Sequence, residues 1–129
     1  MKKTRGWARV KRAGAAHIMR LGAWYQIVDE RNPSLIVLDI AGRDVLVRGD
    51  LVELTREAPQ RFSVVYRSLD DPNPALGTPD DVGPTYAVCP SSGTRVRLTR
   101  QPEHLKCPSC GQDHLLDWEA PIVPAAWRP

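Results

Sequence analysis

The stretch CPSSGTRVRLTRQPEHLKCPSCG, residues 89–111, decides how the second half of this chain folds. It contains two near-copies of one pentapeptide, CPSSG and CPSCG, joined by a basic run in which apolar residues alternate. Each copy favours a tight turn, because proline fixes φ and glycine accepts the positive φ that such turns need. The copies differ where it matters most for chemistry: Ser92 stands in the first copy where Cys110 stands in the second.

Two such turns on neighbouring hairpins resemble the knuckles of a zinc ribbon, and the resemblance covers residues 85–119. In that family each C-x-x-C turn supplies two thiolates to one tetrahedral zinc ion. The resemblance implies that Cys89, Cys107 and Cys110 are metal ligands, that zinc is the cofactor, and that its role is structural. Ser92 departs from the family pattern at the place of the fourth thiolate.

The fourth ligand stays open at the level of the sequence. His104 lies just before the second turn and is the predicted fourth ligand, while His114 follows Cys110 in C-x-x-C-x-x-x-H spacing. An external ligand or water would also complete the coordination. Alternatively the ribbon has lost its metal, Ser92 bonds locally, and apolar packing holds the hairpins. The residues that would then pack are Tyr86, Val88, Leu115 and Trp118.

The same segment also resembles the cluster-binding loops of a Rieske domain, in YAVCPSSG and CPSCGQDHLLDW. That family holds a two-iron cluster with two cysteines and two histidines. Ser91 stands at the place of the first histidine and Cys110 at that of the second. This resemblance implies a degenerate domain that has lost its iron–sulfur cluster.

The first half of the chain consists of short apolar runs separated by turn-forming residues. The runs are HIMRLGAWYQIV, LIVLDI, DVLVR, LVEL and RFSVVYR. Strands at this spacing, joined by Gly, Asp, Asn and Pro, are typical of a small antiparallel barrel, similar in pattern to the Tudor and KOW kinds. We therefore predict an all-β chain: a small antiparallel β-barrel followed by a zinc-ribbon-like (rubredoxin/Rieske-like) β module.

Composition divides the 129-residue chain into five segments. Residues 1–12 are predicted to be a flexible basic arm, and residues 69–84 an acidic, proline-rich linker that cannot build a packed core. Residues 120–129 contain three prolines and form a proline-rich tail. Between these segments lie the barrel, residues 13–68, and the ribbon module, residues 85–119.

Basic residues gather in the arm and on the ribbon module, which predicts an anionic partner. The predicted nucleic-acid-binding residues are Lys2, Lys3, Arg5, Arg9, Lys11, Arg12, Arg95 and Arg97. Such side chains neutralise phosphates, and Trp7 can stack on a base. The predicted function is binding of nucleic acid or service to the machinery that processes it. The alternative is a structural accessory subunit of a larger protein complex.

Other functional classes find little support in the sequence. No Ser/His/Asp or Cys/His pairing indicates nucleophilic catalysis, so we do not expect an enzyme. No run approaches the roughly 18 apolar residues of a membrane-spanning helix. Three cysteines, two of them in C-x-x-C, fit a reducing compartment, and the predicted location is the cytoplasm.

Overall fold

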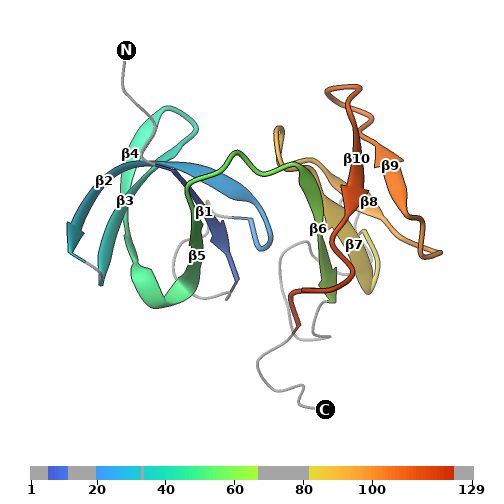
Figure 1. Cartoon of the computed structure of the whole chain (residues 1–129), viewed down its shortest axis with the longest axis horizontal. Coiled ribbons are helices and arrows are strands. Elements are labelled where there is room, and N and C mark those ends of the chain that lie inside the picture. Colours follow the sequence, from blue (N-terminus) through green and yellow to red (C-terminus); the bar gives the residue numbers. More distant parts are fainter. Residues whose placement is uncertain (1–5, 12–19, 33, 67–81, 124–129) are drawn as a thin grey trace. The chain divides into compact units, whose positions relative to one another are not determined.

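The structure, a computed structural model, describes residues 6–11, 20–32, 34–66 and 82–123 (Figure 1). Over these residues the chain forms ten strands and one short 3-10 helix, and the strands make two five-stranded sheets. The predicted all-β class is confirmed. The chain divides into two compact units, Met1–Pro59 and Gln60–Pro129. No helix in the described part of the chain is long and apolar enough to cross a membrane.

The first unit contains one antiparallel sheet that curls into a half-barrel (Figure 1). Its strands are β1 (Trp7–Val10), β2 (Trp24–Asn32), β3 (Leu35–Ile40), β4 (Arg43–Arg48) and β5 (Val52–Thr55). They lie in the order β4-β3-β2-β1-β5, and the 3-10 helix η1 (Gly49–Leu51) joins β4 to β5. The predicted barrel-like sheet is therefore present, with β4 and β5 as its two edges.

Several residues of the first unit have positive φ values, a conformation that side chains disfavour. Ala41 and Gly42 both have positive φ, 54° and 81°, as the two-residue hairpin between β3 and β4 requires. Gly6 has φ 130°, and a Cβ there would lie 2.5 Å from the backbone oxygen of Thr55. Glycine at position 6 thus allows the chain to pass close to β5 before β1 begins.

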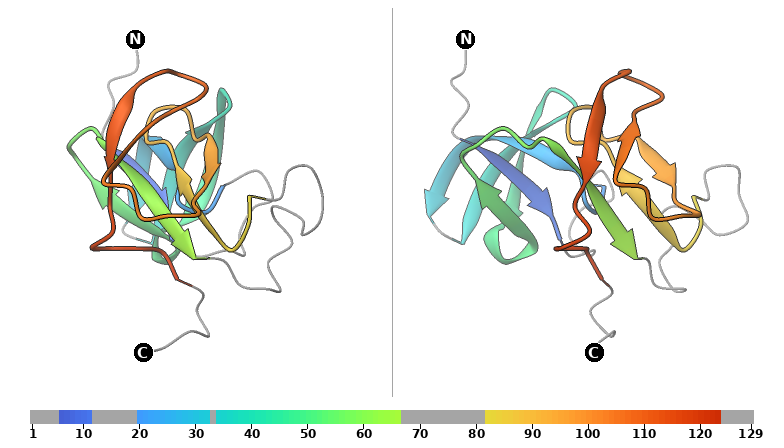
Figure 2. Two further views of the ribbon diagram at one scale, coloured as in Figure 1. Left: turned by 90° about the vertical axis from the view of Figure 1, so that its right-hand side faces the viewer. Right: turned by 45° about the vertical axis from the view of Figure 1, so that its right-hand side comes forward.

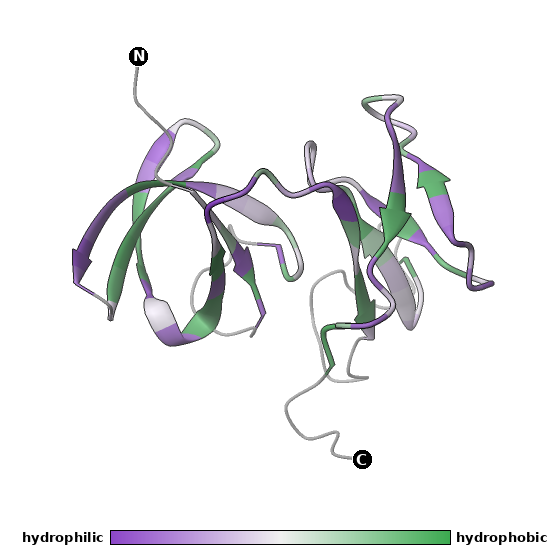
Figure 3. Cartoon of the chain, viewed as in Figure 1, coloured by the Kyte–Doolittle hydropathy of each residue, from purple (hydrophilic) through white to green (hydrophobic). Residues whose placement is uncertain are grey.

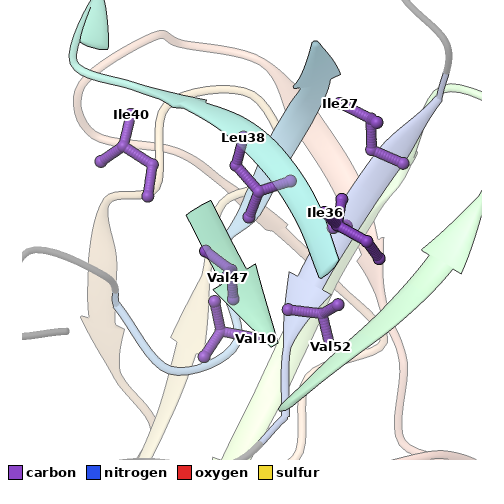
Figure 4. Close-up of a cluster of buried hydrophobic side chains, with 8 residues drawn as sticks. Val10, Ile27, Ile36, Leu38, Ile40, Val47 and Val52 are labelled. Atoms are coloured by element: carbon purple, nitrogen blue, oxygen red, sulfur yellow. The ribbon is translucent and has the colours of Figure 1, made fainter. Parts of the chain in front are cut away.

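Alternating side chains build the core of the first unit. Ile36, Leu38 and Ile40, at every second position of β3, are all buried in one cluster (Figure 4). The cluster also takes residues from each of the other strands, namely Ala8, Val10, Ile27, Val47 and Val52. Figure 3 shows the apolar character of β3 and the polar end of β2. A two-residue period with one buried face explains why this sheet curls around a single core.

The boundaries of the predicted barrel need two corrections. Residues 7–10 were assigned to a flexible arm, but they form β1, which pairs with both β2 and β5. The physical reason is that Ala8 and Val10 are buried on the inner face, so the segment belongs to the core despite its basic neighbours. Residues 61–66, the expected last strand of the barrel, instead belong to the second sheet. Residues 1–5 and 12 of the predicted arm, and most of the predicted linker and tail, lie outside the described residues.

The second unit is a sheet in which two hairpins flank one central strand. Its strands are β6 (Arg61–Tyr66), β7 (Thr85–Val88), β8 (Arg95–Arg97), β9 (His104–Lys106) and β10 (Asp113–Leu116). The order is β8-β7-β6-β10-β9, and β10 pairs with β6 in parallel while every other pair is antiparallel. The sheet order places β10 between β6 and β9 (Figure 1), and Figure 2 shows the same ribbon from two further sides. One hairpin, β7–β8, carries the first pentapeptide and the other, β9–β10, carries the second.

The core of the second unit includes sulfur atoms. Its buried cluster consists of Phe62, Val64, Ala87, Cys89, Cys107 and Leu116. Two of the members, Cys89 and Cys107, are the residues that open the two pentapeptides. The core of the second unit therefore includes the first residue of each of the two hairpin turns.

Candidate metal centre

The two pentapeptides adopt the same turn. In the first, the N–H of Gly93 donates to the carbonyl of Cys89 at 3.0 Å, and in the second the N–H of Gly111 donates to that of Cys107 at 2.9 Å. The two glycines have φ values of 71° and 75°. Each turn thus uses glycine in the left-handed region, which is strained for residues with a Cβ. The sequence repeat is a repeat of backbone geometry.

These turns bring three thiols together. The sulfur atoms of Cys89, Cys107 and Cys110 lie within 4.8 Å of one another, and Cys89 Sγ is 3.7 Å from Cys110 Sγ. Cys89 and Cys107 are buried, whereas Cys110 is exposed, and none of the three forms a disulfide. The three cysteines predicted as ligands are therefore grouped so that they can hold a metal ion.

The hydroxyl of Ser92 also lies at this cluster. Its Oγ is 3.4 Å from Cys107 Sγ and donates a hydrogen bond of 2.8 Å to Oγ1 of Thr94. The backbone N–H of Ser92 points to Cys89 Sγ at 3.5 Å. The sequence pattern marked Ser92 as the missing thiolate, but it did not show that the hydroxyl faces the second turn.

Hydrogen bonds to sulfur change the acidity of the cluster. Burial acts to raise the pKa of Cys107, but hydrogen bonds to its sulfur, among them those from the backbone N–H groups of Cys110 and Ser109, outweigh it and lower the pKa to about 6. At Cys110 the N–H of Gln112 acts to lower the pKa, yet burial and the neighbouring cysteine sulfurs raise it overall. Cys107 therefore offers a thiolate, the form that binds metals, near neutral pH.

Both candidate histidines face other partners. His104, predicted as the fourth ligand, lies outside the group of thiols, and its Nδ1 is 3.2 Å from Oδ1 of Asp113. His114 has Nδ1 3.0 Å from the carbonyl of Gln60 and Nε2 3.1 Å from Oε1 of Gln112. Its ring also meets the ring of Phe62 edge-on. Among the described residues, the three predicted cysteines therefore come together, and neither histidine belongs to their group.

The predicted nucleic-acid-binding residues fall into three groups. Lys2, Lys3, Arg5 and Arg12 lie outside the described residues. Lys11 and Arg97 are exposed, and Arg95 is half-buried on β8. Arg9 is taken up inside the first unit: its side chain is 7% exposed and pairs with the carboxylate of Glu53. Its guanidinium also lies 5.3 Å from the ring centre of Trp24. A cation held in this way is not available to a phosphate.

Comparison of the chain with protein-family models, with curated proteins and with solved structures finds no match. The three close thiols are compatible with a zinc-ribbon-like module.

Proposed function

We propose that this chain is a non-enzymatic binding protein whose second unit is held together by one zinc ion. The observation that carries the proposal is the grouping of Cys89, Cys107 and Cys110 within 4.8 Å on two matching turns. Thiolates in tetrahedral array are the ligands that structural zinc prefers. The ion would connect the β7–β8 hairpin to the β9–β10 hairpin across the central strand.

A structural role fits the place of the ligands in the fold. Cys89 and Cys107 belong to the buried cluster of the second unit, so the ion would be bonded directly to members of that core. Zinc binding contributes directly to folding in small modules of this kind. The ligand turns are also rigid by themselves, since each is closed by a backbone hydrogen bond.

Elemental analysis of the full-length chain, purified without added metal, tests this proposal. We expect about one zinc per chain, and substitution of Cys107 by serine should abolish it. Iron together with acid-labile sulfide would instead support the Rieske-like interpretation. Absence of any metal, with failure to take up added zinc, would contradict the proposal.

The partner we propose is nucleic acid or a nucleoprotein assembly. Exposed Arg97 and half-buried Arg95 lie on β8, an edge strand of the second sheet, and Lys11 is exposed just after β1. Within each unit these residues would neutralise phosphates, as would the basic residues at the start of the chain. Arg9 is left out because Glu53 and Trp24 hold it.

Salt dependence tests the proposed partner. The full chain should bind single- or double-stranded DNA or RNA with an affinity that falls as salt rises, since counterions are released. Replacing Arg95 and Arg97 by alanine should weaken binding, whereas Arg43→Ala on β4, an edge strand of the other unit, should not. Binding that is absent, or insensitive to salt, would contradict this partner.

A structural accessory subunit remains the second candidate, because large apolar side chains are exposed on both edges of the half-barrel. Leu46 on β4 is 58% exposed and Leu54 on β5 is 47% exposed. Edge strands also present backbone groups that can pair with another chain. This candidate predicts a fixed protein partner that co-purifies with the chain, and no response to nucleic acid.

A further inference from the structure

Two distances among the thiols and the Ser92 hydroxyl fit opposite edges of one tetrahedron. Cys89 Sγ and Cys110 Sγ are 3.7 Å apart, and Ser92 Oγ and Cys107 Sγ are 3.4 Å apart. The two pairs share no atom, so they form opposite edges. With Zn–S at about 2.3 Å and Zn–O at about 2.0 Å, a regular tetrahedron has an S···S edge of about 3.8 Å and an S···O edge of about 3.5 Å. Both observed edges agree with these values to about 0.1 Å.

The repeat of the two turns identifies the residue that stands at the fourth corner. Cys89 and Cys107 open the pentapeptides, and Ser92 and Cys110 are their fourth residues. Each opposite edge joins the first residue of one turn to the fourth residue of the other. Ser92 Oγ thus occupies the corner that the repeat assigns to a thiolate.

The local hydrogen bonds leave this oxygen able to act as a ligand. Ser92 Oγ gives its proton to Oγ1 of Thr94 at 2.8 Å, and it accepts a long bond, 3.3 Å, from the N–H of Thr94. A hydroxyl that donates to Thr94 can direct a lone pair toward a cation between the sulfurs. Ser91, the neighbouring serine, instead donates to Oε1 of Gln112 at 3.1 Å.

We infer that Ser92 is the fourth ligand of the metal centre, which would make it a centre of three thiolates and one hydroxyl oxygen. The inference rests on the proposed zinc site and deepens it. The oxygen ligand has two consequences. A neutral hydroxyl leaves the zinc complex with less negative charge than four thiolates would. An oxygen is also a harder donor than sulfur. The site should therefore discriminate against softer ions, in favour of zinc, better than a site of four thiolates does.

Cobalt(II), loaded into the metal-free full-length chain, is the probe that tests the ligand. Tetrahedral cobalt has intense visible bands, and its sulfur-to-metal charge-transfer absorption grows with the number of thiolates. The wild-type chain should show tetrahedral bands with three thiolates. Ser92→Cys should raise the charge-transfer absorption by about one third and tighten binding, because it restores a four-thiolate set.

Removal of the hydroxyl tests whether the fourth ligand is Ser92 or a bound water molecule. Ser92→Ala should weaken zinc binding, measured by competition with a chromophoric chelator, by about tenfold or more. Ser92→Thr, which keeps a hydroxyl, should recover much of the affinity and the wild-type cobalt spectrum. Ser91→Ala is the matched control and should leave both unchanged, since Ser91 faces Gln112.

The outcomes distinguish this inference from the proposed function. Equal zinc affinity and equal cobalt spectra for wild type and Ser92→Ala would overturn Ser92 as a ligand while leaving the zinc site in place. Failure of the wild type and of Ser92→Cys to bind either metal would overturn both. Weakened binding in Ser92→Ala, recovery in Ser92→Thr and no change in Ser91→Ala would establish the ligand.

Discussion

The two units of this chain are both small β structures, but different residues complete their cores. The first unit buries a cluster made only of aliphatic side chains, drawn from all five of its strands. The second buries a smaller cluster, and two of its members are Cys89 and Cys107. Aliphatic burial stabilises the first unit without any ligand. The second contributes sulfur where the first contributes isoleucine and valine, so we expect its stability to depend on the proposed metal ion.

The largest expected effect comes from removing the metal. Because binding to a structural zinc site is coupled to folding, chelation or Cys107→Ser should open the second unit and leave the first intact. Amide hydrogen exchange of the full chain measures this directly: protection should fall in β6–β10 and persist in β1–β5. Loss of protection in both units, or in neither, would show that the contrast between the two cores is wrong.

A cavity in the core of the first unit should destabilise that unit and leave the second unaffected. Leu38 on β3 is fully buried, so Leu38→Ala should lower the free energy of unfolding of the first unit by about 2–5 kcal/mol. Urea unfolding followed by Trp fluorescence and by hydrogen exchange would measure it, and zinc content should stay unchanged. Leu46→Ala, at an exposed position of β4, is the control and should change stability by no more than about 0.5 kcal/mol.

The Arg9–Glu53 pair gives a smaller effect in the same unit. Glu53→Gln removes the charge that faces the buried guanidinium, and the expected loss is about 1–3 kcal/mol, moderated by the half-exposed position of Glu53. The loss should decrease in high salt, because screening also weakens the wild-type pair. Thermal melts at two ionic strengths check both points. An unchanged melting temperature would mean that the stacking on Trp24 alone holds Arg9.

The smallest effect on stability is expected at the surface of the second unit. Arg97→Ala should change the free energy of unfolding by no more than about 0.5 kcal/mol, since the side chain is exposed. In a nucleic-acid binding assay the same substitution should reduce the slope of log affinity against log salt by about one phosphate contact. A large loss of stability, or an unchanged slope, would show that Arg97 serves the fold and not a partner.

Much of the architecture could be predicted because it is encoded locally. The apolar run LIVLDI and the alternation in DVLVR predicted β3 and β4, and the two residues between them, Ala41 and Gly42, have the positive φ values that a two-residue hairpin needs. The repeated pentapeptides predicted two matching turns, and Gly93 and Gly111 adopt matching conformations. Such features depend on residues close in sequence, so single-sequence patterns contain them.

The features that could not be predicted depend on contacts between distant residues. The sequence did not predict β1, because Arg9 and its basic neighbours indicated a solvated arm. The buried charge of Arg9 is explained by its ion pair with Glu53 in β5. β6 continued the barrel pattern in sequence, but its partners are β7 and the parallel β10. Ser92 looked like a gap in a ligand set until its distance to Cys107 was known.

The parallel pairing of β6 with β10 has a consequence for the order in which the second unit forms. His114 on β10 contacts Gln60, which is 54 residues earlier in the chain, so this pairing closes a long loop and is slow to form by chance. A metal ion that joins the two turns would first bring the hairpins together and so shorten the effective loop. We therefore expect zinc to accelerate folding of the second unit, and to leave the refolding rate of the first unaffected.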